Sequence, residues 1–286
     1  MNIQWYPGHM TKTRRQIEAD LKNVDMVAEI IDARIPISSR NPDIDAIVGE
    51  KPRLIVLNRA DQADSSTTGK WIDYFQRRGW VVLVTDAKTG KGVKEFSATV
   101  KEALKEQIAR WREKGQVGRP VRVMVVGVPN VGKSTFINQV ARRKSAKAGD
   151  RPGVTRGKQW VAVDSGLDLL DTPGILWPKF EDPQVGLNLA FTGAVKDDIM
   201  DTEALACHLL ELLNTYYPTA LSERYKVEPD QAAQGWELLE RAARKRGFLI
   251  SGGEVDTQRM ANVLLDEFRG GKLGRITLER PPEEEL

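Results

Sequence analysis

The sequence predicts an α/β fold in which a mostly parallel sheet with helices is followed by a smaller all-helical part. Short apolar runs rich in β-branched residues alternate with helical stretches through the first 180 residues, which is typical of a parallel sheet. A glycine-rich turn at 127–134 joins one of these runs directly to a helical stretch. After Trp177-Pro178 the sequence contains helical patterns only.

Six apolar runs are expected to form the strands. The first four runs alternate with helical stretches along the chain, so we expect those strands to be mostly parallel. The last two runs flank Ser165-Gly166, which predicts a two-residue hairpin and therefore one antiparallel strand. The expected strands are Met26–Asp32, Arg53–Leu57, Val81–Thr85, Val121–Val126, Gln159–Asp164 and Leu167–Leu170.

Apolar residues at helical spacing predict the helices. Those of the first part are Lys12–Leu21, Thr68–Arg78, Val93–Trp111 and one that begins at Lys133. Those of the second part are Thr202–Asn214, Gln231–Arg246 and Val255–Phe268. The change in character predicts a boundary near residue 180, with one domain over 1–180 and a second over 181–286.

The composition excludes several classes of protein. Of 286 residues, 41% are hydrophobic and 29% are charged, which is typical of a globular chain. The single cysteine, Cys207, excludes an internal disulfide and a metal cluster built from cysteines. No apolar run approaches the roughly 18 residues that a membrane helix needs, and the first ten residues lack the features of a signal or transit peptide. We therefore expect a cytoplasmic protein without membrane association.

The strongest motif is Gly127-Val-Pro-Asn-Val-Gly-Lys-Ser134, which matches the phosphate-binding loop pattern between a strand and a helix. Its glycines let backbone N–H groups turn toward phosphates, and the lysine reaches the β and γ phosphates. The competing interpretation is a glycine-rich turn with an accidental lysine, which the flanking strand and helix disfavour. The candidate nucleotide-binding residues here are Asn130, Val131, Gly132, Lys133, Ser134 and Thr135.

Two further segments indicate a magnesium site. Asp171-Thr-Pro-Gly174 follows an expected strand, where the aspartate can hold Mg²⁺ and the Gly174 N–H can meet the γ-phosphate. Thr155 lies between this segment and the phosphate loop, where a loop threonine can join Ser134 and Asp171 as a Mg²⁺ ligand. Alone, the first is an ordinary Pro-Gly turn and the second a loop threonine.

The base is expected to be read by Asn58-Arg59-Ala60-Asp61, at the end of an expected strand. The Asp61 carboxylate can accept two N–H groups of guanine, a donor pair that adenine lacks, and Asn58 can tie this loop to the phosphate loop. The competing interpretation is a helix cap or turn. Asp86-Ala87-Lys88 follows the next strand and can offer a backbone N–H to the guanine O6, although alone it is hardly a signal.

Taken together, these motifs resemble the circularly permuted ribosome biogenesis GTPase A family (RbgA/YlqF-like). The base-reading segments precede the phosphate loop, Thr155 and Asp171–Gly174, which is the permuted order. The other segments that carry the resemblance are Pro7-Gly8-His9-Met10, Asp32-Ala33-Arg34-Ile35-Pro36, Asn41-Pro42, Ser251-Gly-Gly and Gly270-Gly-Lys-Leu-Gly-Arg275. The resemblance spans essentially the whole chain.

The resemblance implies a GTPase domain followed by a helical domain that binds RNA or the ribosome. It implies a GTP hydrolase that binds the precursor of the large (50S) ribosomal subunit, both rRNA and ribosomal proteins, and acts at a late assembly step. Hydrolysis would be stimulated by the particle, and we expect the protein to be a monomer. Two residues depart from the family pattern: Arg59 replaces the usual lysine, and Asp86 replaces the usual serine.

The catalytic residues are expected to be Lys133 and His9. Many GTPases orient the attacking water with a glutamine directly after Asp-x-x-Gly, but here that residue is Ile175, which has no polar side-chain atom. The family points to the histidine of Pro-Gly-His-Met, and an imidazole can both accept and donate a hydrogen bond. The competing interpretation is that the segment around His9 is a structural N-terminal hook.

Asn130 is a candidate ligand for potassium. In potassium-dependent GTPases an asparagine at this position helps to hold K⁺ beside the phosphates, and the resemblance favours that role. The alternative is an ordinary turn residue.

Basic residues indicate two candidate RNA surfaces. Residues 139–158 carry seven basic residues against one acidic residue, and they overlap the loop that contains Thr155. The second cluster comprises Arg241, Arg244, Lys245 and Arg246.

Two alternatives to a ribosome-assembly GTPase remain open from the sequence. One is a P-loop kinase of a small metabolite, which Asn58–Asp61 argues against. The other is a nucleotide-gated RNA-binding protein with negligible hydrolysis, which Ile175 supports.

Overall fold

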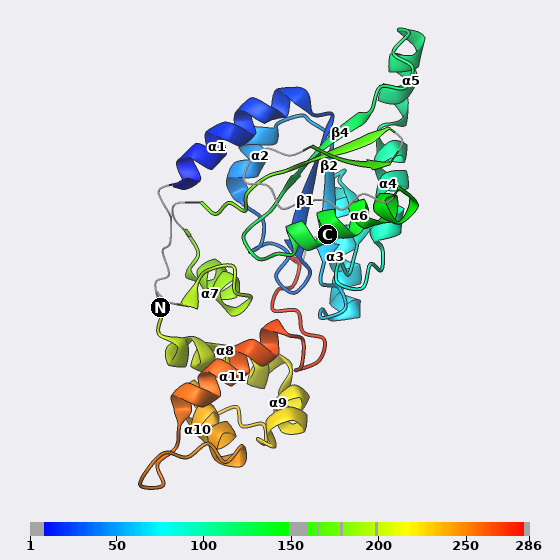
Figure 1. Ribbon diagram of the computed structural model, residues 1–286. Helices are drawn as coiled ribbons and strands as arrows, with labels where there is room; N and C mark the ends of the chain where they lie inside the picture. Colours follow the sequence, from blue (N-terminus) through cyan, green and yellow to red (C-terminus); the bar gives the residue numbers. More distant parts are fainter. Residues whose placement is uncertain (1–8, 149–159, 165, 178–179, 198–199, 283–286) are drawn as a thin grey trace. The chain divides into compact units, whose positions relative to one another are not determined.

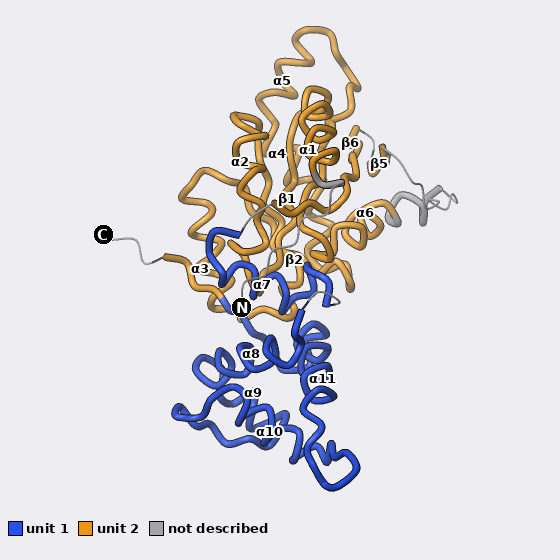
Figure 2. The backbone as a smooth tube through the Cα atoms, turned by 90° about the vertical axis from the view of Figure 1, so that its left-hand side faces the viewer, with its two compact units in different colours: residues 1–5, 179–278 blue, residues 6–178, 279–286 orange. Residues whose placement is uncertain are grey.

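The computed structural model describes residues 9–148, 160–164, 166–177, 180–197 and 200–282. The chain forms two compact units, shown in Figure 2. The sheet unit contains Tyr6–Pro178 and Glu279–Leu286, and the helical unit contains Lys179–Leu278. The last residues therefore belong to the sheet unit, whereas the sequence pattern assigned all of 181–286 to the helical part.

One six-stranded sheet forms the centre of the sheet unit (Figure 1). Its strand order is β3-β2-β1-β4-β6-β5, and all neighbouring pairs are parallel except β5 with β6. The strands are β1 (Met26–Asp32), β2 (Arg53–Asn58), β3 (Val81–Val84), β4 (Val121–Val126), β5 (Trp160–Asp164) and β6 (Leu167–Asp171). The predicted parallel sheet with one antiparallel strand is confirmed. Because parallel strands end at the same edge, the loops after β1, β2, β4 and β6 all lie along one side of the sheet.

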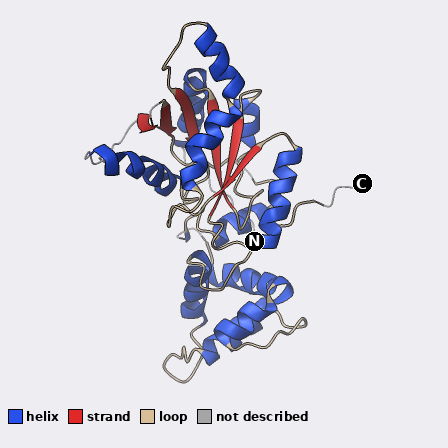
Figure 3. Ribbon diagram, turned by 90° about the vertical axis from the view of Figure 1, so that its right-hand side faces the viewer, coloured by secondary structure: helices blue, strands red, loops and turns tan. Residues whose placement is uncertain are grey.

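Helices cover both faces of this sheet (Figure 3). On one side α1 and α2 are joined by an ion pair between Arg14 and Asp43 at 2.8 Å. Elsewhere α4 and α6 meet through an edge-on contact between the rings of Phe96 and Phe136. The helices are α1 (His9–Asp20), η1 (Leu21–Asn23), α2 (Pro42–Val48), α3 (Ser65–Arg77), η2 (Val93–Glu95), α4 (Phe96–Ala103), α5 (Lys105–Glu113) and α6 (Lys133–Ala148).

The core under α3 shows why these segments pack. Trp71 and Phe75 lie four residues apart on α3 and stack with ring centroids 5.7 Å apart. They pack on the buried strand residues Ile31, Ile55 and Leu57. Burying two large aromatic rings stabilises the sheet unit by several kcal/mol at about 25 cal/mol per Å² of apolar surface.

Two local features differ from the sequence prediction. The expected helix over Val93–Trp111 is broken at Leu104, which is buried and has a non-helical backbone, so α4 and α5 are separate. The short helix α2 was not predicted. It begins with Pro42 after an Asn41 cap whose side chain accepts the Asp43 N–H, and this cap and proline are the signal that could have revealed it.

The helical unit contains five helices among its described residues, and α8, α10 and α11 pack together. They are α7 (Pro183–Phe191), α8 (Thr202–Tyr216), α9 (Pro218–Tyr225), α10 (Gly235–Lys245) and α11 (Thr257–Arg269). The three predicted helices are present, although α10 begins four residues later than expected. The unpredicted helices α7 and α9 are short and begin with a proline, like α2. Within the described residues no helix is long and apolar enough to cross a membrane.

Glu267 on α11 holds three elements of the helical unit together. Its carboxylate accepts hydrogen bonds from the Arg224 guanidinium, from the Tyr225 hydroxyl at 2.8 Å and from Arg246 at 3.3 Å. Hydrogen bonding from Arg224 lowers the pKa of Glu267 although burial opposes the shift. A carboxylate with a lowered pKa contributes stability above its unfolded-state pKa of about 4.3, and this contribution is lost as the pH falls through the folded-state value.

Replacing Glu267 with Gln is therefore expected to lower the free energy of unfolding by about 2–3 kcal/mol at neutral pH. Chemical unfolding at pH 7 and below pH 4 checks this, because the difference from the wild type should shrink at the lower pH. Glu240→Gln is the matched control, since Glu240 forms an exposed i,i+4 pair with Arg244 and should cost no more than about 0.5 kcal/mol. Equal losses for both variants would contradict a central role for Glu267.

The chain returns to the sheet unit at Glu279. The Glu279 carboxylate accepts the backbone N–H groups of Ile37 at 2.7 Å and Ser38 at 2.9 Å, and its carbonyl accepts the Trp71 indole N–H at 3.3 Å. These bonds fasten the final segment to the loop after β1. No apolar pattern marks this segment, which is why the sequence did not separate it from the helical part.

Candidate nucleotide-binding site

A cavity of about 560 Å³ lies at the carboxyl edge of the sheet. Three sequence-predicted segments line it: the expected base-reading loop after β2, the phosphate loop after β4 and the segment after β6. The lining residues are Arg59, Val128, Pro129, Asn130, Gly132, Lys133, Ser134, Thr135 and Gly174. The volume is that of a typical small-molecule site. Residues that are far apart in the sequence therefore meet in one cavity.

The phosphate loop needs glycine at two positions for steric reasons. Gly132 has φ = 97°, and a Cβ there would lie 2.4 Å from the Asn58 Nδ2. A Cβ on Gly127 would lie 2.6 Å from the carbonyl oxygen of Ile30. Asn130 also has a left-handed backbone, with φ = 58°, which asparagine tolerates better than most residues. The loop can therefore close around a ligand only with small or permissive residues at these positions.

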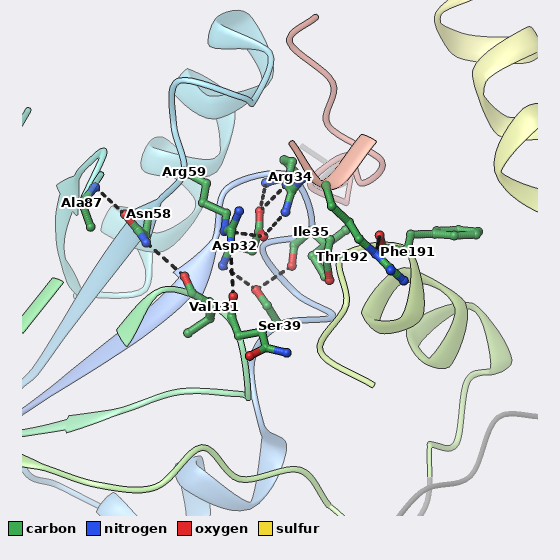
Figure 4. A network of polar contacts seen from close by, with 12 residues as sticks. Asp32, Arg34, Ile35, Ser39, Asn58, Arg59, Ala87, Val131, Phe191 and Thr192 are labelled. Carbon is green, nitrogen blue, oxygen red and sulfur yellow. Dashed lines mark hydrogen bonds and ion pairs between the residues drawn. The ribbon is translucent and has the colours of Figure 1, made fainter. Parts of the chain in front are cut away.

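Asn58 joins the base-reading loops to the phosphate loop (Figure 4). Its Nδ2 donates to the carbonyl oxygen of Val131 at 3.0 Å. Its Oδ1 accepts from the Thr85 hydroxyl at 3.1 Å and from the Ala87 backbone N–H at 3.0 Å. Because Asn58 is 2% exposed, these bonds are protected from water. The side chain thus holds three loops in one arrangement, as the sequence predicted for two of them.

Arg59 lies beside the phosphate loop with a left-handed backbone, φ = 58°. Its Nη2 donates to the carbonyl oxygen of Asn130 at 3.1 Å, and its Nε lies 3.7 Å from the Asp32 Oδ2. Burial lowers the pKa of the Arg59 guanidinium, and the Asp32 carboxylate opposes that shift. The residue that departs from the family pattern is therefore in contact with the phosphate loop.

Asp61, the predicted base-reading residue, and the loop after β3 lie in different environments. Asp61 is exposed, so its carboxylate is accessible to a base. Asp86 is buried and caps its own turn, because its Oδ1 accepts the backbone N–H groups of Lys88 at 2.9 Å and Thr89 at 3.2 Å. The Ala87 N–H belongs to the segment predicted to offer a backbone N–H to the guanine O6. It donates to the Asn58 Oδ1 here, so a base that used this N–H would have to share it.

Lys133, which lines the cavity, contacts Asp171. The Lys133 Nζ lies 3.4 Å from the Asp171 Oδ1, and Asp171 is the last residue of β6. Ser134 is exposed in the first turn of α6. The Ser134 hydroxyl follows Lys133 in the chain, and the Asp171 carboxylate contacts Lys133. Hydroxyl and carboxylate oxygens are the hard donors that Mg²⁺ prefers, so the donor set fits this ion.

The segment after Asp171 is closely packed. A Cβ on Gly174 would lie 2.9 Å from the Pro129 Cα, and Thr172 donates to the carbonyl oxygen of Val125 at 2.7 Å. Ile175 is 3% exposed and its N–H donates to the carbonyl oxygen of Gly127 at 3.2 Å. The residue after Asp-x-x-Gly is therefore both apolar and buried, and it cannot orient a water molecule.

Some predicted residues lie outside the described part of the structure. Thr155 is one of them. The backbone of α1 begins at His9, and α6 continues through the first basic residues of 139–158, but the side chains at His9 and at 142–148 are not described. Cys207, which the sequence excluded from a cluster, lies on α8.

Sequence reasoning missed two contributors to the site, Thr85 and Asp32. Asp32 is the last residue of β1 and Thr85 directly follows β3, and both strands neighbour β2, which ends at Asn58. Asp32 pairs in register with Asn58. A polar residue directly after an apolar strand was the available signal.

Comparison with known proteins adds independent findings. The family model described as 50S ribosome-binding GTPase matches residues 122–233. Ribosome biogenesis GTPase A of Bacillus cereus is 48% identical over 285 residues, which cover 99% of this chain and 95% of that protein. The protein of the same name from Priestia megaterium is also 48% identical, over 100% of this chain and 99% of its own. The crystal structure of GNP-bound YlqF from T. maritima superposes with a TM-score of 0.67 at 30% identity, covering 95% of this chain and 99% of that one.

Proposed function

Because the chain belongs to the ribosome biogenesis GTPase A family, we propose that it binds the precursor of the large ribosomal subunit and hydrolyses GTP at a late assembly step. The chain is a circularly permuted GTPase, a GTP hydrolase of ribosome biogenesis whose partner is a ribosomal subunit. Beyond this, we propose that the particle is a precursor of the large subunit, that the step is late and that the particle stimulates hydrolysis. We also propose that the protein is a monomer and is located in the cytoplasm.

The hydrogen bonds of Asn58 carry the proposal for the nucleotide. They connect the loop that holds Asp61 to the phosphate loop, so guanine recognition and phosphate binding belong to one rigid arrangement. A metabolite kinase is set aside because the relatives are GTPases of ribosome biogenesis. Negligible hydrolysis is set aside for the same reason.

We assign the following roles in the cavity. Lys133 exchanges its contact with Asp171 for the β and γ phosphates when a nucleotide binds, and the N–H groups of Val131, Gly132, Ser134 and Thr135 surround the phosphates. Asp61 reads the base, Arg59 stacks on it, and Gly174 senses the γ-phosphate.

Magnesium is the proposed metal. Ser134 and Asp171 would hold it, with Thr155 as a further ligand, and when bound it would neutralise charge on the phosphate oxygens. The contact between Lys133 and Asp171 keeps both side chains at the phosphate end of the cavity.

Potassium remains a proposal that rests on Asn130, which lines the cavity with its backbone in the left-handed region. An amide oxygen there can contribute to a K⁺ site beside the phosphates. Hydrolysis in KCl and NaCl at equal ionic strength tests this, and equal rates would contradict it.

We assign ribosome binding chiefly to the helical unit and to the basic residues of 139–158. Asp171–Gly174 lies only a few residues before Lys179, where the helical unit begins. Loss of the γ-phosphate can therefore be passed along a short covalent connection to an RNA-binding module.

The proposed function is tested by measuring hydrolysis and co-sedimentation together. We expect turnover of GTP to rise when large-subunit precursors are added, and binding to the particle to be stronger with a non-hydrolysable GTP analogue than with GDP. Mature small subunits are the control particle. Equal turnover with and without large-subunit particles would contradict the proposal.

Replacing Arg142, Arg143, Lys144 and Lys147 with Gln should weaken binding to the particle and flatten its salt dependence. Each phosphate contact that is lost should lower the slope of log affinity against log salt concentration by about one unit. Co-sedimentation across a salt series measures that slope. The control for net charge has the same number of changes at exposed residues of α5 and its C-cap: Lys105, Arg110, Arg112 and Lys114. An identical slope in both variants would mean that the run is only a solvated surface.

A further inference from the structure

Two arginines share one buried carboxylate beside the nucleotide cavity (Figure 4). Asp32 is 3% exposed and Arg34 is 1% exposed. Arg34 binds both carboxylate oxygens: its N–H and Nε donate to Oδ1 at 2.9 and 3.0 Å, and its Nη2 donates to Oδ2 at 2.8 Å. Arg59 approaches the same Oδ2 at 3.7 Å, within ion-pairing range but beyond a hydrogen bond.

The backbone around Asp32 keeps this carboxylate in place. The Asp32 N–H donates to the Ser39 hydroxyl at 2.9 Å, and that hydroxyl donates to the carbonyl oxygen of Ile35 at 2.7 Å. Burial alone would raise the pKa of Asp32, but the charges of Arg34 and Arg59 outweigh it and lower the pKa. Asp32 therefore remains charged at neutral pH, as a counter-ion to Arg34 and Arg59.

The position of Arg59 follows from this competition for Asp32. Arg34 donates hydrogen bonds to both carboxylate oxygens, whereas Asp32 attracts Arg59 by charge alone, at 3.7 Å. The Arg59 Nε is buried and has no hydrogen-bond partner among the residues that the structure describes, while its Nη2 donates to Asn130 at the cavity wall. The guanidinium is thus held at the cavity with a donor still unused.

We propose that Asp32 and Arg34 form a positioning pair that orients Arg59 toward the base and ribose of the bound nucleotide. The pair acts through Arg59 and does not touch the phosphates. This inference rests on the proposed function, because it assumes that guanosine occupies the Arg59 end of the cavity. The guanidinium of Arg59 suits this arrangement, because its Nη2 contacts Asn130 while its Nε faces Asp32. A lysine has a single nitrogen and cannot make both contacts with the same geometry.

A double-mutant cycle on the full-length chain tests the pair. The variants are Asp32→Asn, Arg59→Met and the two combined, with GDP affinity measured by calorimetry and KM and kcat for GTP measured with large-subunit particles. Asp32→Asn is expected to weaken GDP binding and raise KM about tenfold, with kcat at saturating GTP unchanged. In the Arg59→Met background the same change should cost no further affinity, because there is no guanidinium left to orient.

Asp25→Asn is the matched control. Asp25 is also a buried carboxylate that holds an arginine, Arg119 at 2.8 Å, but it lies just before β1, at the opposite edge of the sheet. Its replacement should lower the melting temperature and leave the affinity for GDP unchanged. If Asp32→Asn lowers GDP affinity equally with and without Arg59, its role is only structural and the inference is overturned.

If Asp32→Asn does not fold, Arg34→Lys takes its place in the cycle. Lysine keeps a positive charge beside the Asp32 carboxylate, but it loses the guanidinium's simultaneous hydrogen bonds to both carboxylate oxygens. The same dependence on Arg59 is expected, and additive losses would overturn the inference. Failure of the proposed function gives a different result: Asp61→Asn would then keep its preference for GTP. Failure of the positioning role alone would leave the effect of Asp61 intact.

Discussion

Replacing Asp61 with Asn is expected to shift the nucleotide preference from GTP toward XTP by at least roughly a hundredfold. The carboxylate of Asp61 accepts two N–H groups of guanine, whereas an amide presents a donor that matches the O2 of xanthine. Asp61 lies three residues after Asn58 and is exposed, so its side chain is accessible to the base. Competition between GTP and XTP for the purified protein measures the preference.

Asp64→Asn provides the matched control for this change. Asp64 lies three residues further on and caps α3, where its side chain accepts the Thr67 N–H at 2.7 Å. Asparagine caps helices as well as aspartate does, so this variant should bind GTP like the wild type. If Asp61→Asn prefers GTP over XTP as strongly as the wild type does, Asp61 does not read the base.

Replacing His9 with Ala is expected to reduce particle-stimulated GTP turnover by at least about a hundredfold, the lower bound for a positioned general base or water-orienting group. Ile175 is apolar and buried, so it cannot orient the attacking water and another group must do so. The affinities for GTP and GDP should remain nearly intact, because ground-state binding rests on the phosphate loop and Asn58–Asp61. The basal rate should change little if His9 acts only on the particle.

The measurement is hydrolysis with saturating large subunits, together with thermal stability and co-sedimentation. His208→Ala is the control, since this histidine lies on α8 beside Glu211 in the helical unit and should leave stimulation unchanged. A structural hook at the N-terminus would instead lower stability, basal activity and particle binding together. Stimulation of the His9 variant within a few-fold of the wild type would refute the catalytic assignment.

Local patterns allowed most of the fold to be predicted. The strands were found because apolar β-branched runs are interrupted by polar helical stretches. Among the described residues, both ends of each observed strand lie within one residue of the predicted ends. The short helices α2, α7 and α9 were missed because seven to nine residues cannot establish a helical period. The break at Leu104 was missed because both sides of it have helical composition.

The candidate site was predictable in its motifs but not in its connections. Phosphate loops and Asn-x-x-Asp segments can be recognised because each chemical role needs a particular residue at a particular spacing. The pairing of Asp86 with its own turn, and the use of the Ala87 N–H by Asn58, depend on distances that no spacing encodes. These contacts refine the expected base-binding loop without removing it.

The sequence by itself determined the α/β class, the permuted order of the motifs and the residue types that line the cavity, because these depend on local periodicity and on short, contiguous segments. Only the tertiary structure decided that Asp32, Arg34 and Arg59 share one buried charge cluster and that Glu279 returns to the loop after β1. Charged residues give no periodic signal, and Glu279 lies more than two hundred residues from its partners. Burying a charge without a counter-ion costs several kcal/mol, so these residues pair with the opposite charges or polar groups that the folded chain places beside them.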